Sequence, residues 1–130
     1  LQPGLLGDVS NSLAAFQSGL TELGIGDSVV TFTQSDFGRT LTSNGDGTDH
    51  AWGGHQLVLG NPVRGRQVYG RMPSLEIGGP DDIGGGRIVP TLGVDQYAGT
   101  LLRWFGLTPA QITAAAPNLA NFGVRDLQFV

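Results

Sequence analysis

Residues 29–55, VVTFTQSDFGRTLTSNGDGTDHAWGGH, carry an apolar β-branched run that passes directly into a glycine-rich polar stretch. The apolar run predicts a buried strand over residues 28–34. The polar stretch after it, residues 35–55, contains both histidines of the chain and three aspartates. Open α/β sheets bind ligands at the carboxyl ends of their strands. We therefore expect the functional chemistry of the chain in residues 35–55.

The composition restricts the class of protein. A chain of 130 residues suits one domain, and 22 glycines predict many turns and close backbone approaches. The absence of cysteine excludes disulfides and thiolate-bound zinc. A net charge of −4, with arginine as the only basic residue type, argues against a nucleic-acid partner or an anionic membrane surface. No apolar run reaches the roughly 18 residues that a membrane span requires, and without a lysine no phosphate-binding P-loop can form.

Three helices are predicted. Apolar residues at three- and four-residue intervals predict helices over 8–23 and 94–105, the first of them capped by Asp8 or Ser10. Thr108, followed by a proline, is typical of an N-cap and predicts a third helix that ends near residue 116.

Short strands complete the expected fold. Besides 28–34, apolar runs predict strands over 56–59 and 67–71, whereas residues 72–90 read as an irregular loop in which glycine-flanked aspartates form turns rather than a calcium site. The tail 118–130 should dock onto the body. We expect one domain with a three-layer α/β/α arrangement around a small, mostly parallel sheet. The residues expected to be buried are Val9, Leu13, Phe16, Leu20, Val29, Val30, Phe32, Leu57, Leu59, Leu101, Leu102 and Phe105.

The polar stretch contains candidate metal ligands. Asp36 at the end of the strand and the imidazoles of His50 and His55 are ligand types that suit zinc, manganese or iron. The alternative without a metal is that the histidines are exposed or form hydrogen bonds with loop carbonyls, and that the aspartates form turns. Arg39 has two interpretations, because its fork of donors suits either an anionic ester or an ion pair with Asp36.

The order of motifs resembles a known family. After residues 29–60, the segments VYGR (68–71), VDQYAGTLLRWFG (94–106) and PNLANF (117–122) follow in order. This pattern resembles the C-terminal part of the family named domain of unknown function 1501 (DUF1501). These sulfatase-like bacterial proteins are commonly exported and are regarded as distant relatives of alkaline phosphatases and sulfatases.

The resemblance implies a metal site in an alkaline phosphatase-like fold. Asp36 matches an aspartate that binds metal in the wider superfamily, but Phe37 stands where those proteins have a metal-binding histidine. His55 resembles a later histidine ligand, and Asp49 with His50 would supply the ligand that Phe37 removes. The implied cofactor is a divalent metal, zinc or manganese.

The implied activity is metal-dependent hydrolysis of a phosphate or sulfate ester, with Arg39 binding the small anionic substrate. Nothing in the chain resembles the half of those enzymes that carries the nucleophile. We therefore expect a C-terminal fragment of a larger sulfatase-like domain, periplasmic or secreted, that needs an N-terminal part for activity. The alternative, suggested by Phe37, is a non-catalytic structural or partner-binding derivative. The oligomeric state stays open.

Overall fold

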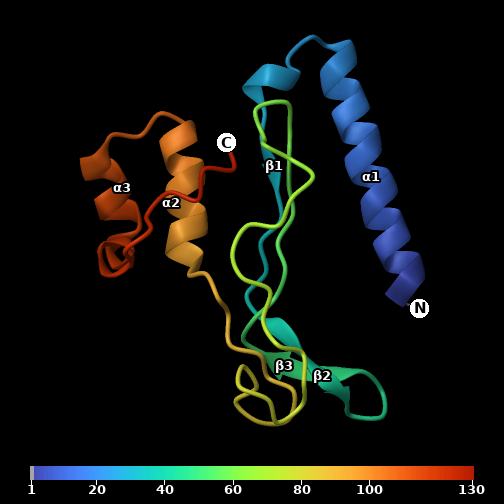
Figure 1. Ribbon diagram of the computed structural model, residues 1–130. Helices are drawn as coiled ribbons and strands as arrows, with labels where there is room; N and C mark the ends of the chain where they lie inside the picture. Colours follow the sequence, from blue (N-terminus) through green and yellow to red (C-terminus); the bar gives the residue numbers. More distant parts are fainter. Residues whose placement is uncertain (1) are drawn as a thin grey trace. The chain divides into compact units, whose positions relative to one another are not determined.

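A computed structural model describes residues 2–130, with side chains from residue 3 onward, and divides the chain into two compact units. Unit 1 consists of the described residues up to Phe32 together with Val58–Val63, and unit 2 consists of Thr33–Leu57 and Arg64–Val130. Figure 1 labels the helices and strands. Each unit is described by itself.

Unit 1 is built on one long helix. Helix α1 spans Gln2–Glu22, six residues more at its start than the predicted 8–23, so that the expected caps Asp8 and Ser10 lie inside it. The early start is consistent with Pro3, because the φ of proline is already helical. Proline also lacks the backbone N–H, which in the first turn of a helix has no partner within the helix. The helix ends at Glu22, one residue before the predicted end, and Gly24, with a φ of 68°, follows it as the predicted stop.

A short connection and a pair of two-residue strands follow in unit 1. The 3-10 turn η1 spans Gly26–Ser28, and strand β1 (Thr31–Phe32) pairs antiparallel with β4 (Val58–Leu59). These strands are much shorter than the predicted 28–34 and 56–59. A side-chain network ties the connection to the helix, because Asn61 accepts a hydrogen bond from Gln17 at 3.2 Å and donates one to Asp27 at 2.8 Å.

Unit 2 contains a small helical core. Helices α2 (Val94–Trp104) and α3 (Pro109–Ala115) lie beside one another (Figure 1). Together with the 3-10 turn η2 (Pro117–Asn121) they pack around Ile112, Ala116 and Leu119. Both predicted helices of this region are confirmed.

The Thr108 cap and the docked tail of unit 2 are also confirmed. The hydroxyl of Thr108 accepts a hydrogen bond from the Gln111 amide, and the Gln111 side chain accepts one from the Thr108 amide, which completes a capping box. The tail docks as expected through Phe129, which is 2% exposed.

The polar stretch 35–55 folds as a β-hairpin, which the sequence analysis missed. Strand β2 (Gly38–Ser43) pairs antiparallel with β3 (Thr48–Ala51) (Figure 1). The register between the strands is irregular between Arg39 and Ser43. Asn44 closes the turn, because its side-chain oxygen accepts the amides of Asp46 and Gly47.

The expected mixed α/β composition is confirmed, but the expectation of a mostly parallel sheet was wrong. Both pairs of strands in the described residues are antiparallel. The four residues between β2 and β3 are too few for a parallel crossover, which needs about a dozen or more. The predicted strand over 67–71 is also absent from the described structure, where this segment is irregular.

Most of the expected buried residues are not buried. Of that set only Leu20 lies in the core, whereas Val9 is 45% exposed, Phe16 52% and Phe105 77%. Phe32 and Leu57 are also exposed, and the other expected residues are partly buried. Spacing places these residues on one face of an element, but burial also requires another element to cover that face. The buried apolar residues observed are Leu20, Ile88, Ile112, Ala116, Leu119 and Phe129.

The irregular loop predicted over 72–90 is confirmed, apart from one isolated bridge between Asp82 and Ile88. Its tightest part is the run Gly84, Gly85 and Gly86, with φ angles of 115°, 64° and 76°. This left-handed region favours glycine because a Cβ atom would clash with the backbone. Three consecutive residues of this kind turn the chain sharply beside Asp82.

Candidate anion-binding site on the β2–β3 hairpin

Three side chains gather on one face of the hairpin. The imidazole of His50 stacks on the ring of Phe37 with 4.0 Å between ring centroids and 24° between the planes. The Arg39 guanidinium carbon lies over the same Phe37 ring, 5.2 Å from its centroid. The ring thus holds a guanidinium and an imidazole near one another on an exposed surface.

The strand register explains this gathering. Arg39 and His50 are cross-strand partners, and Phe37 lies two residues before Arg39, on the same face. Gly38, between them, leaves no room for a side chain, since a Cβ there would overlap the carbonyl oxygen of Gly53. The backbones of Gly38 and Gly53 therefore approach closely at the residue that follows Phe37.

Arg39 forms a hydrogen bond that fixes its direction. Its Nη1 donates to the carbonyl oxygen of Thr48 at 2.8 Å. In the described structure Arg39 makes no ion pair with Asp36, so that alternative was wrong. A guanidinium has five N–H donors, and one such bond leaves most of them available to an anion.

Asp49 lies apart from His50 although the two are adjacent in sequence. Successive side chains of a strand point to opposite faces, and the Asp49 carboxylate accepts a hydrogen bond from Asn44 at 2.8 Å. The Asp49 amide donates to the hydroxyl of Thr40, a buried residue on the face away from Arg39. The hairpin therefore gives Asp49 a turn-stabilising contact.

The four predicted metal ligands do not form a complete centre. Asp36 and His55 are exposed residues outside the strands, and His50 packs on Phe37. Throughout residues 3–130, no three histidine, aspartate or glutamate side chains lie close enough together to hold a metal ion. In the described structure, strand alternation separates Asp49 from His50, and the Phe37 ring lies against the His50 imidazole.

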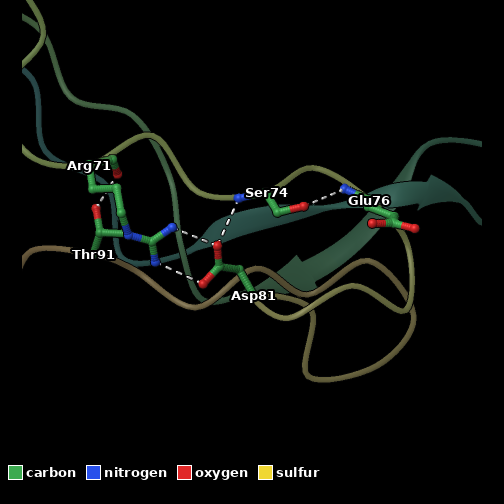
Figure 2. A network of polar contacts seen from close by, with 5 residues as sticks. All are labelled: Arg71, Ser74, Glu76, Asp81 and Thr91. Atoms are coloured by element: carbon green, nitrogen blue, oxygen red, sulfur yellow. Dashed lines mark hydrogen bonds and ion pairs between the residues drawn. The ribbon is translucent and has the colours of Figure 1, made fainter.

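A second polar network, which the sequence analysis missed, lies in the irregular part of unit 2. Figure 2 shows Arg71 in a two-pronged ion pair with Asp81, each N–O distance being 2.8 Å, while the Ser74 amide donates to the same carboxylate at 2.7 Å. The hydroxyl of Thr91 donates to the Arg71 carbonyl at 2.7 Å. Hydrogen bonds from Arg71 and then from Ser74 lower the pKa of Asp81 to about 2. The arginine of VYGR (68–71) and the neighbouring aspartates Asp81 and Asp82 were the sequence signals from which this network could have been expected.

Asp82 organises the glycine loop beside this network. Its carboxylate accepts the amides of Gly78 at 2.9 Å, Gly84 at 2.8 Å and Gly86 at 3.1 Å. These bonds, that of Gly78 foremost, lower the pKa of Asp82. Asp82 is therefore a turn former, as predicted, whereas Asp81 is the ion-pair partner of Arg71. Both carboxylates are occupied by donors of the chain itself.

Comparison with known proteins identifies the family. Residues 2–118 match the family model described as protein of unknown function (DUF1501), which covers most of the chain. The chain belongs to this family. No curated protein and no solved structure matches it. In addition, no helix among the described residues has the length and apolar character needed to cross a membrane.

Proposed function

We propose that this chain is the C-terminal part of a sulfatase-like hydrolase of phosphate or sulfate esters, related to alkaline phosphatases. Its contribution is the hairpin face that carries Arg39 and His50, which would bind the anionic ester group. Membership of the DUF1501 family is consistent with this proposal, and so is the order of motifs. The proposed location, periplasmic or secreted, rests on the same resemblance.

The observation that carries the proposal is the pair of cationic or protonatable groups around one exposed ring. Arg39 and His50 both contact Phe37, and both are exposed to solvent. A guanidinium recognises the oxygens of a phosphate or sulfate through parallel N–H donors. A neighbouring imidazole adds a further donor to the same oxygens.

The metal remains a separate prediction. Asp36, Asp49, His50 and His55 are the candidate ligands for zinc or manganese, but they do not meet in the described structure. The proposed role of the hairpin is therefore ester binding, and catalysis is assigned to the complete protein, whose N-terminal part would carry the nucleophile.

The test uses the polypeptide as the cell makes it, assayed with p-nitrophenyl phosphate and p-nitrophenyl sulfate in the presence of zinc or manganese. Removing a charged hydrogen bond costs about 1.5–3 kcal/mol, so Arg39→Ala should raise KM at least about tenfold. His50→Gln should raise KM by a smaller factor. Arg64→Ala is the matched control, because its exposed side chain lies outside the hairpin and makes no hydrogen bond in the described structure.

Two results would contradict the proposal. Failure of the natural protein to hydrolyse either ester with any divalent metal would reject the activity. Equal KM values for Arg39→Ala and Arg64→Ala would reject the assigned role of the hairpin, even if the protein is a hydrolase.

A second candidate function, partner binding without catalysis, is favoured by a different observation. Helix α1 exposes large apolar side chains along its length, including Leu5, Leu6, Val9 and Phe16. Exposed apolar clusters are typical of surfaces that another polypeptide covers. If this candidate is right, native mass spectrometry of the natural protein should show a specific assembly, and Phe16→Ser should dissociate it. The natural protein should also hydrolyse neither ester.

A further inference from the structure

Beyond the hairpin, unit 2 has a small hollow between α2, α3 and η2. Its volume is about 110 Å³, and its lining combines apolar side chains with two arginines. Ile112 and Leu119, both buried, form the apolar part together with Pro109. Arg103 and Arg125 supply the charged part. An apolar floor with cationic groups at its edge suits a ligand that has an aliphatic end and an anionic end.

The two guanidinium groups are held in place by the chain itself. Arg103 pairs with Asp126 at 2.9 Å, which compensates its charge. Arg125 instead donates to two backbone carbonyl oxygens, through Nε to Phe122 at 3.2 Å and through Nη2 to Ala120 at 2.9 Å. Since Arg125 forms no ion pair in the described residues, its charge is left for an external anion.

Arg125 also keeps donors for such an anion. Two of its five N–H groups make the carbonyl bonds, and the others are still able to form hydrogen bonds. A guanidinium that is already ordered loses less side-chain entropy when it binds, so these carbonyl contacts favour binding. The oxygens of a carboxylate match the spacing of the guanidinium fork.

The size of the hollow limits the ligand. Pockets for drug-sized molecules measure about 300–1,000 Å³, so a hollow of about 110 Å³ admits only a short aliphatic group. We propose that this hollow binds a small branched aliphatic carboxylate, with the aliphatic end on Ile112 and Leu119 and the carboxylate on Arg125. Such a group occurs as a free short-chain acid or as the C-terminal residue of a peptide.

The test is an NMR titration of the 130-residue chain with isovalerate. The Ile112 methyl signals and the Arg125 Nε–Hε signal should shift together and saturate. Isovaleramide, which has the same shape without the charge, should not bind. N-acetyl-leucine and N-acetyl-leucinamide then distinguish the source, because a C-terminal residue requires binding of the former without the latter, whereas a free acid requires isovalerate to bind more tightly than N-acetyl-leucine.

Variants assign the binding to the hollow. Arg125→Gln should weaken isovalerate at least about tenfold through loss of a charged hydrogen bond, whereas Arg87→Gln, outside the hollow, should have no effect. Because Arg125 also binds two carbonyls, the fold of its variant is checked by the same spectra. Thr113→Leu, at an exposed position in the lining, is the second variant and should block binding by filling the hollow.

Three outcomes would overturn the proposal. These are shifts that do not saturate, equal binding of isovaleramide, and unchanged binding by a folded Arg125→Gln or Thr113→Leu variant. Since none of these measurements involves the hairpin or ester hydrolysis, their failure leaves the proposed function untouched.

Discussion

Gly38→Ala tests whether the close backbone approach of Gly38 and Gly53 holds the hairpin site together. A Cβ at position 38 would overlap the Gly53 carbonyl oxygen. Gly53 has no room to retreat, because a Cβ there would lie 2.7 Å from the Ile88 carbonyl oxygen and its amide donates to that oxygen at 2.9 Å. The clash is between backbone atoms, so no side-chain rotation relieves it.

The expected magnitude follows from this rigidity. Overpacking costs about 1–3 kcal/mol, and a clash with fixed backbone belongs at the upper end, near 3 kcal/mol. With a urea dependence of about 2 kcal/mol per molar, the unfolding midpoint of unit 2 should fall by about 1.5 M. The matched control is Gly47→Ala in the same hairpin. It has no atom within 4 Å of the new Cβ and its φ lies outside the left-handed range, so it should stabilise by about 0.4–1 kcal/mol.

Two measurements check this prediction. Urea denaturation of the full chain, followed by amide signals of unit 2, gives the midpoints of both variants. The His50 ring protons, which the stacked Phe37 ring should shield, report the site directly and should move toward their unstacked shifts in Gly38→Ala only. If both variants have the same midpoint and the same His50 shifts, the close approach does not organise the site.

Three further perturbations have expected outcomes. Ile112→Ala should lower the free energy of unfolding by about 2–5 kcal/mol in urea, against less than about 0.5 kcal/mol for the exposed Ala114→Ser; equal values would place the core elsewhere. The pKa of Asp81 is lowered to about 2 in the folded chain. The ionised carboxylate therefore stabilises the fold fully above the usual aspartate pKa near 4, and this stabilisation is lost as the pH falls through 2. The Ser74 amide shift should therefore titrate near pH 2, and a midpoint near 4 would contradict the ion pair. Burial raises the pKa of Tyr97 to about 12, so stability should fall as pH rises above its unfolded value near 10; native phenolate absorbance of Tyr97 appearing already at pH 10 would refute this.

Local signals made the C-terminal helices predictable. Thr108 with a following proline, and Gln111 three residues later, form a cap whose partners are all within one turn. Gly24, which follows the end of α1 at Glu22, is a local signal of the same kind. The start of α1 was misplaced because Asp8 and Ser10 are acceptable caps that the helix passes through, and a proline at its beginning was the stronger signal.

The hairpin could have been predicted but was not. Asn44 and Gly45 form a turn dipeptide between two runs of β-prone residues, which is a strong hairpin signal. Recognising β3 would also have separated Asp49 from His50, because adjacent strand residues face opposite ways. The stacking of His50 on Phe37 required the register between the strands, which a single sequence does not contain.

Burial could not be read from spacing. Val9 and Phe16 have the periodicity of a core-facing helix, but they are exposed, and no element of unit 1 covers them. Conversely, Ile88 lies in an irregular segment without periodicity and is nevertheless buried, at 7% exposure. An apolar residue is buried only where another element covers it, whatever its spacing in the sequence.

The glycine run at 84–86 has a consequence for the order in which unit 2 opens. Glycine loses more backbone entropy on folding than any other residue, and the loop around Asp82 is held by amide bonds to one carboxylate while its neighbour Ile83 stays 60% exposed. Segments with few apolar contacts open at low free energy while the rest stays folded. Amide hydrogens of this loop should thus exchange with solvent earlier than those of α2, and a nonspecific protease should cut here first.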